Sequence, residues 1–243
     1  MYYIRKMIIS GNYFERYEYD KSINRDFTRE AKPKKKEKEQ LSLPLEEKME
    51  IIGKRSDSIS RTRSKIRRII QSNPDLTKFV TLTFRKNMTD VAKANKIFSK
   101  FIMRLNYRYP NFKYISIIEF QKRGAVHYHF LCNLPFIKNT LLAEIWDNGN
   151  IKINKIKHVD NLGAYVCKYL QKDMNDKRLF QKKKYFCSKN IELPVEVYDD
   201  KIIGNLILQY DLDNVQFTYR TEFSVKYIGK IKYTVYKLNN CIA

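Results

Sequence analysis

Two of the three histidines in the chain, His127 and His129, are separated by one residue inside the otherwise apolar run "GAVHYHFL" (124–131). In a β-strand, residues two positions apart point to the same face of the sheet. The run therefore predicts two imidazoles side by side, about 7 Å apart along the strand, with Tyr128 on the opposite face. Paired imidazoles are a common metal-binding arrangement, although two histidines can also meet by chance.

The hairpin that leads into this strand adds a carboxylate. If Lys122-Arg123-Gly124 is a three-residue loop whose glycine takes the left-handed position of a G1 bulge, Glu119 lies directly opposite His127 on the same face. A two- or four-residue loop would send Glu119 to the other face. Two imidazoles and one carboxylate with open coordination positions suit Mg²⁺ or Mn²⁺ presented to a substrate oxygen. The same ligands also serve non-haem iron oxygenases, so they do not fix the chemistry alone.

Later in the chain, the run "YVCKYLQK" (165–172) contains the phrase Tyr-x-x-Lys twice. On a helix, Tyr165 and Tyr169 lie one turn apart at the edge of an apolar stripe, with Lys168 and Lys172 beyond them. A phenol with a pKa near 10 is about 0.1% ionised at pH 7, so its use as a nucleophile costs roughly 4 kcal/mol. A nearby lysine and a divalent ion that polarises a phosphate would lower this barrier. The alternative is ordinary packing at a core margin.

The charge balance points to a polyanionic partner. The chain has 48 Lys+Arg against 26 Asp+Glu, a net charge of +22. This excess favours nucleic acid ahead of an anionic membrane. A hydrophobic content of 43% excludes disorder throughout. We expect no membrane span, because no apolar run is long enough, and no signal peptide, because the N-terminal residues are too charged. Four scattered cysteines favour a reduced, cytoplasmic setting, and the Lys-, Ile-, Asn- and Tyr-rich composition suits a bacterial or phage genome.

The order of predicted elements indicates the fold class. We expect strands at 78–84, 113–120, 126–134 and 151–157, a helix capped by Thr89, a short helix at 136–146, and a last helix capped by Asp160. This order predicts an α+β domain: a central antiparallel β-sheet with flanking helices on one face. Whether the strand-like runs that follow, at 195–199, 205–212, 216–228 and 232–238, join the same sheet is left open.

Three regions follow from this pattern. Residues 1–59 are expected to form an N-terminal charged arm or linker, 60–175 the core domain, and 176–243 a β-rich C-terminal extension. A basic helix should end at Asn73-Pro74. Its arginines could lie along a phosphate backbone or simply face solvent; they are Arg61, Arg63, Arg67 and Arg68.

The motifs resemble those of the HUH endonucleases, specifically the rolling-circle replication initiators of small plasmids and single-stranded DNA phages. "FVTLTF" (79–84) is similar to the first motif, "EFQKRGAVHYHF" (119–130) to the second and "YVCKYLQK" (165–172) to the third. The tyrosines follow the histidine pair, as in replication initiators, whereas conjugative relaxases usually place them ahead. The resemblance covers about 60–175 and implies a ferredoxin/RRM-like core.

For individual residues, the resemblance implies a metal held by His127, His129 and Glu119, and a structural or DNA-contacting role for Thr81 and Thr83. Tyr165 or Tyr169 would attack a DNA phosphodiester, and Lys168 and Lys172 would stabilise the phosphate charge. Arg123, at the hairpin tip, could contact the DNA backbone or be a solvated turn residue.

The resemblance implies site-specific nicking and joining of single-stranded DNA through a 5′-phosphotyrosine. The freed 3′-hydroxyl would prime a host polymerase, and strand separation would need a host helicase. No GxxxxGK[ST] loop is found, so no use of ATP is expected. Two alternatives stay open: a transposase of the same superfamily, and a non-catalytic nucleic-acid-binding domain whose aromatic residues stack on bases.

Overall fold

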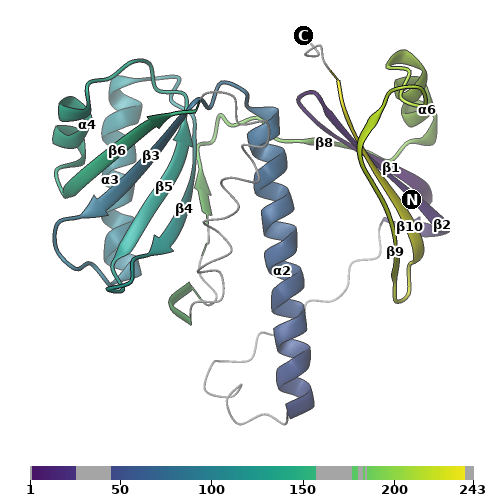
Figure 1. Cartoon of the computed structure of the whole chain (residues 1–243), viewed down its shortest axis with the longest axis horizontal. Coiled ribbons are helices and arrows are strands. Elements are labelled where there is room, and N and C mark those ends of the chain that lie inside the picture. The colour runs from purple at the N-terminus through teal and green to yellow at the C-terminus, as the bar shows by residue number, and fades with distance from the viewer. Residues whose placement is uncertain (1, 26–44, 157–176, 180–182, 184, 239–243) are drawn as a thin grey trace. The chain divides into compact units, whose positions relative to one another are not determined.

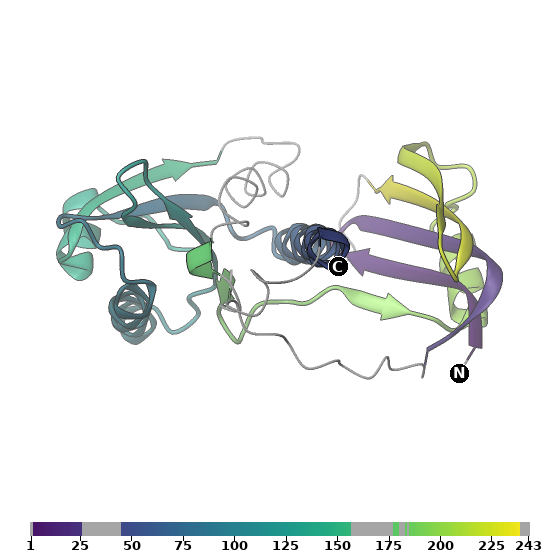
Figure 2. The same ribbon diagram turned by 90° about the horizontal axis from the view of Figure 1, so that it is seen from below.

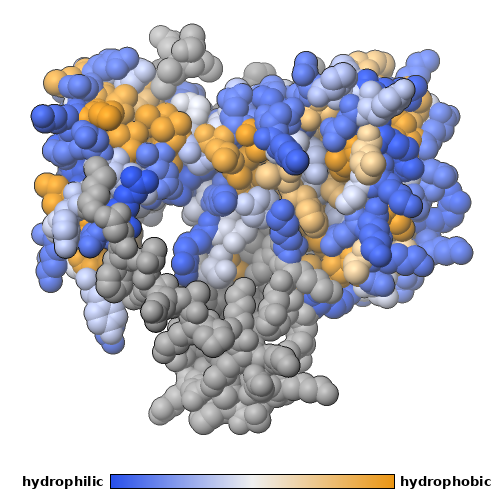
Figure 3. All heavy atoms as spheres, turned by 180° about the vertical axis from the view of Figure 1, so that it is seen from behind, coloured by the Kyte–Doolittle hydropathy of each residue, from blue (hydrophilic) through white to orange (hydrophobic). Residues whose placement is uncertain are grey.

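The computed structural model describes residues 2–25, 45–156, 177–179, 183 and 185–238. The chain divides into two compact units, one of residues 62–192 and one that combines 1–61 with 193–243 (Figure 1). The sequence had placed the boundaries at 59/60 and 175/176, and had not anticipated that the two ends of the chain share a unit. On the face drawn in Figure 3, hydrophilic residues cover much of the surface and hydrophobic residues form patches between them.

The unit of residues 62–192 is built on a five-stranded sheet. The strands are β3 (Lys78–Phe84), β4 (Tyr114–Phe120), β5 (Val126–Cys132), β6 (Gly149–Lys155) and β7 (Tyr185–Cys187), in the spatial order β6-β3-β5-β4-β7. Every neighbouring pair is antiparallel. This confirms the predicted α+β class with a central antiparallel sheet, and the four longer strands lie where the sequence predicted them.

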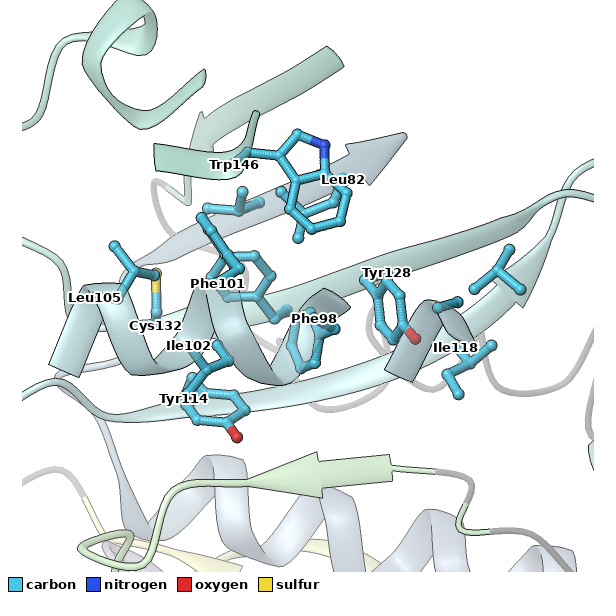
Figure 4. Close-up of a cluster of buried hydrophobic side chains, with 14 of the residues drawn as sticks. Leu82, Phe98, Phe101, Ile102, Leu105, Tyr114, Ile118, Tyr128, Cys132 and Trp146 are labelled. Atoms are coloured by element: carbon cyan, nitrogen blue, oxygen red, sulfur yellow. The ribbon is translucent and has the colours of Figure 1, made fainter. Parts of the chain in front are cut away.

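Helices α3 (Val91–Arg108) and α4 (Asn139–Trp146) bury one face of this sheet (Figure 1 and Figure 2). Phe98 of α3 stacks on Tyr128 of β5, with ring centroids 4.3 Å apart. Figure 4 shows both rings in the cluster of buried side chains, which also contains Trp146 of α4. The sheet face that carries Tyr128 is therefore the core, and the histidines point to the other face.

The first turn of α3 differs from the prediction. Asp90, not Thr89, is the N-cap, because its carboxylate accepts hydrogen bonds from the backbone N–H groups of Ala92 and Lys93. Both residue types are favoured at this position, and an aspartate also interacts well with the positive end of the helix dipole. The predicted cap was therefore wrong by one residue.

Helix α2 (Leu45–Ser72) ends where the sequence predicted, directly before Asn73-Pro74. The Asn73 side chain donates to the carbonyl of Ile69, 2.7 Å away, and exchanges two hydrogen bonds with the backbone of Glu192. These bonds satisfy an otherwise open helix end and hold together the two ends of the unit of residues 62–192.

The second unit has its own antiparallel sheet. Its strands are β1 (Tyr2–Ser10), β2 (Tyr13–Asn24), β8 (Val195–Val197), β9 (Phe217–Val225) and β10 (Gly229–Lys237), in the order β8-β1-β2-β10-β9. Helix α6 (Asp200–Gln209) packs Ile203 and Ile207 against Met7 and Phe14 of this sheet. The strands of the C-terminal extension therefore pair with the N-terminal strands of the chain and not, apart from β7, with the first sheet.

The strand expected at 205–212 was wrong, because most of this run lies in α6. Asp199 caps the helix through hydrogen bonds to the N–H groups of Lys201 and Ile202. The apolar residues that are buried follow a spacing of four, typical of one helix face. Among the described residues, no helix is both long and apolar enough to cross a bilayer.

Candidate metal centre

The hairpin between β4 and β5 sets the register of the site. The N–H of Gln121 donates to the carbonyl of Ala125, 2.8 Å away, and Gly124 closes the loop with a bond to the Gln121 carbonyl. Gly124 has a φ of 86°, a left-handed conformation that favours glycine. Glu119 consequently pairs with His127 across the two strands. The predicted three-residue loop and its register are confirmed.

Glu119, His127 and His129 each offer one ligand atom, and these atoms lie within 4.8 Å of one another. The Nε2 atom of His129 is 2.5 Å from Oε2 of Glu119. The side chains of His129 and Glu119 are only 7% and 13% exposed. One carboxylate and two imidazoles are therefore gathered in a largely buried setting, open on one side to a pocket.

Strand β3 contributes a hydroxyl to each imidazole. Thr81 Oγ1 lies 3.0 Å from Nδ1 of His129, and Thr83 Oγ1 lies 2.9 Å from Nε2 of His127. Both contacts follow from the register, in which Thr81 pairs with His129 and Thr83 with His127. The contacts of the two threonines among the described residues are thus with the imidazoles, and hydroxyls in this position fix the orientation of a ligating histidine. A direct contact of either threonine with DNA stays a prediction.

The residues fit a divalent cation. With His129 Nε2 as a ligand, its Nδ1–H donates to Thr81 Oγ1, so the ring orientation and the tautomer are both fixed. A carboxylate with two neutral imidazoles leaves room in the coordination sphere of Mg²⁺ or Mn²⁺ for substrate oxygens. The donor set does not by itself identify the metal.

Aromatic rings support the histidine strand on both sides. Phe79 stacks on His129, with ring centroids 5.5 Å apart. On the core side, the Tyr128 hydroxyl donates to Asn95 Oδ1, 2.6 Å away, and burial raises the pKa of Tyr128 above its ordinary value. Tyr128 is therefore a neutral packing residue, and the imidazoles are held on a rigid strand.

An open pocket of about 570 Å³ lies over the three ligands; its lining residues are Thr81, Glu119, Gln121, Lys122, Arg123, His127 and His129. Arg123 is placed by hydrogen bonds from its guanidinium to the Phe84 carbonyl, 3.1 Å away, and to the Gln121 side chain, 2.9 Å away. The two cations from the hairpin loop give the pocket a positive rim beside the metal ligands, which suits a phosphate group.

The other predicted site residues have different outcomes. The α2 arginines are exposed at Arg61 and half-buried at Arg63, Arg67 and Arg68, and the pocket lining does not include them. Their role in binding nucleic acid stays a prediction. The predicted nucleophiles and cations of the third motif, together with the expected helix cap, lie outside the described residues; they are Tyr165, Tyr169, Lys168, Lys172 and Asp160.

Arg178 is a residue that the sequence did not single out. Its Nη1 donates to the carbonyl of Gly124, 2.7 Å away, and its guanidinium lies 3.5 Å from the centre of the Phe120 ring. The adjacent Leu179 is 2% exposed in the core. The chain just after the third motif is therefore attached to the loop that carries Arg123. No local pattern could have indicated this, since the contact joins segments far apart in sequence.

One family comparison gives a result. The profile of a family of replication-associated proteins, described as the replication-associated protein ORF2 family, matches residues 77–174, less than half of the chain. The match includes all three metal ligands and the third motif, and it supports a role in replication. No curated protein and no solved structure shows a significant similarity to the chain.

Proposed function

We propose that this protein is a metal-dependent endonuclease that nicks and rejoins single-stranded DNA at a specific site and thereby starts rolling-circle replication of a plasmid or phage. The observation that carries the proposal is the convergence of Glu119, His127 and His129 under a pocket with a cationic rim. The family match over 77–174 and the net charge of +22 support it. The setting would be the cytoplasm of a bacterial host cell.

A bound Mg²⁺ or Mn²⁺ would polarise the scissile phosphate and draw charge away from its oxygens. Lys122 and Arg123, at the rim, would bind the flanking phosphates of the strand. The largely buried carboxylate and imidazoles hold the metal in one position, so the phosphate is oriented before the reaction begins.

The nucleophile is the phenol of Tyr165 or Tyr169. Its oxygen forms a bond to phosphorus as the P–O3′ bond breaks, and the proton that it loses is replaced by one on the departing 3′-hydroxyl. Lys168 and Lys172 would favour the phenolate and the charged transition state. The phosphotyrosine bond keeps the free energy of the broken bond, so the reverse attack reseals the strand without ATP. Between the two steps, the 3′-hydroxyl would prime a host polymerase behind a host helicase.

The described residues on either side of the third motif support this assignment. Ile156 is held at one end of the sheet, where its N–H donates to the Thr77 carbonyl, 3.0 Å away. Arg178 is held at the opposite end of β5 by Gly124. The six residue steps of β5 span about 20 Å, and a helix over 161–173, as the sequence predicts, would have about the same length. The two anchors are thus compatible with a helix that carries its phenols past the pocket.

The test uses the full chain, Mn²⁺ and a library of random-sequence single-stranded oligonucleotides labelled at the 3′ end, because the recognised sequence is unknown. The expected result is a labelled protein–DNA adduct that survives a denaturing gel. The adduct should be lost with EDTA, in His129→Gln, and in the double variant Tyr165→Phe/Tyr169→Phe. Tyr107→Phe, in which a phenol that is 93% exposed on α3 is removed, is the matched control and should keep the adduct. Salt-sensitive binding without any adduct would instead identify a non-catalytic binding protein.

A further inference from the structure

Strand β9 is a long edge strand. It runs from Phe217 to Val225, forms the end of the second sheet, and pairs on its inner side with β10 (Figure 1). Within the part of the chain that the structure describes, no strand pairs with its outer side. A row of outward backbone N–H and C=O groups is a template for another strand, and natural edges are usually short or carry lysines that prevent such pairing. β9 is nine residues long and has no lysine.

The side chains of β9 are unusually apolar for their exposure. Phe217, Tyr219, Phe223 and Val225 are exposed by 43%, 54%, 42% and 37%. Tyr219 and Phe223 share one sheet face, where they pair with Val235 and Ile231 of β10. Large aromatic side chains left on an edge indicate a surface that is covered in the functional state.

The sequence of β9 is complementary to itself. In an antiparallel pair of two β9 strands centred on Thr221, Arg220 of one copy stands opposite Glu222 of the second copy, and the two-fold axis repeats this ion pair. In the same register Tyr219 faces Phe223, and Phe217 faces Val225. Each residue thus meets a partner of suitable chemistry, as an isologous interface requires. We propose that β9 is a homodimerisation strand, which joins the second sheets of two copies into one continuous sheet.

The charge of β9 selects this occupant over nucleic acid. The chain carries 48 Lys+Arg against 26 Asp+Glu, yet β9 carries one arginine and one glutamate and is neutral. A base-stacking surface would be expected to combine its aromatic residues with several cations. Arg220 uses one N–H toward Thr234 Oγ1, 3.3 Å away, and its guanidinium has further donors for a carboxylate.

The test is a charge exchange in the full chain, followed by sedimentation velocity over a concentration series at physiological ionic strength. The wild type should show a concentration-dependent monomer–dimer equilibrium. Arg220→Glu and Glu222→Arg should each weaken dimerisation by about tenfold or more, because each replaces two ion pairs by two like-charge pairs. A 1:1 mixture of the two variants should dimerise again, as should the double variant R220E/E222R, since opposite charges then face each other.

Lys201→Glu, on the exposed start of α6, changes the net charge as much as Arg220→Glu does and should leave the equilibrium unchanged. Recovery in the mixture also shows that each single variant is folded. The proposal is overturned if the wild type stays monomeric throughout the series, if the single variants dimerise like the wild type, or if the mixture stays monomeric. It also fails if Arg220→Glu weakens binding of an oligo(dT) probe while dimerisation is unaffected, since β9 would then contact nucleic acid.

Discussion

Mn²⁺ should stabilise the unit of residues 62–192 through Glu119. The perturbation is Glu119→Gln, which keeps the shape of the side chain but removes the charged ligand that lies 2.5 Å from His129. In the wild type, a metal that binds the folded unit and not the unfolded chain raises the free energy of unfolding by about 2.7 kcal/mol at a concentration 100 times Kd. In the variant, the loss of one of three ligands should remove most of this gain.

The size of the unit converts this free energy into a temperature shift. The unit spans residues 62–192. About 130 residues at about 2.1 cal/mol/K each give an unfolding entropy of roughly 0.27 kcal/mol/K, so 2.7 kcal/mol corresponds to about 10 °C. We therefore expect the midpoint of the wild type to rise by about 10 °C at saturating Mn²⁺.

The assay is thermal unfolding followed by tryptophan fluorescence, with and without Mn²⁺. Trp146 is the one tryptophan in the sequence, and it is fully buried in this unit, so the signal reports on this unit alone. The control is Glu192→Gln, which removes an exposed carboxylate of the same unit that pairs with Lys113. The control should keep the full metal-induced shift. An equal shift in Glu119→Gln and the wild type would refute the assignment of the ligand.

Three further outcomes are expected. Thr81→Val removes the hydroxyl that contacts Nδ1 of His129 and should weaken Mn²⁺ binding about tenfold by calorimetry; unchanged affinity would contradict the orienting role. Phe98→Ala, at a side chain 2% exposed, should destabilise the unit by about 3–5 kcal/mol in urea unfolding followed by Trp146 fluorescence, and a loss below about 1 kcal/mol would argue against the packing described. Burial raises the pKa of Cys132 to about 12, which lowers the thiolate fraction at pH 8, so iodoacetamide should label this thiol only after unfolding; peptide mass spectrometry that finds it labelled in the folded protein would refute its burial.

The metal ligands could be predicted from sequence because the signals are local. Strand alternation places His127 and His129 on one face, and a glycine in the third loop position fixes Glu119 opposite them. The same reasoning could not give the orienting role of Thr81, because it depends on β3 lying next to β5, a contact between segments far apart in the chain. Arg178 escaped notice for the same reason.

The second unit shows where sequence reasoning fails. Strand β2 pairs with β10 from the opposite end of the chain, and no local pattern encodes such a pairing. The apolar run at 205–212 looked like a strand, and only the cap at Asp199 and the spacing of Ile203 and Ile207 distinguish it as a helix. Short apolar runs are ambiguous between the two structures, and the capping residue resolves the ambiguity.

The central claim, metal-dependent attack of a phenol on DNA, is tested most directly by mapping the covalent bond. After reaction with Mn²⁺ and single-stranded DNA, the adduct is trimmed with nuclease, digested with protease and analysed by tandem mass spectrometry. The account predicts a nucleotide mass on the peptide that contains Tyr165 and Tyr169, and none when EDTA is present. A nucleotide attached to any other residue, or an adduct that forms equally without metal, would contradict it.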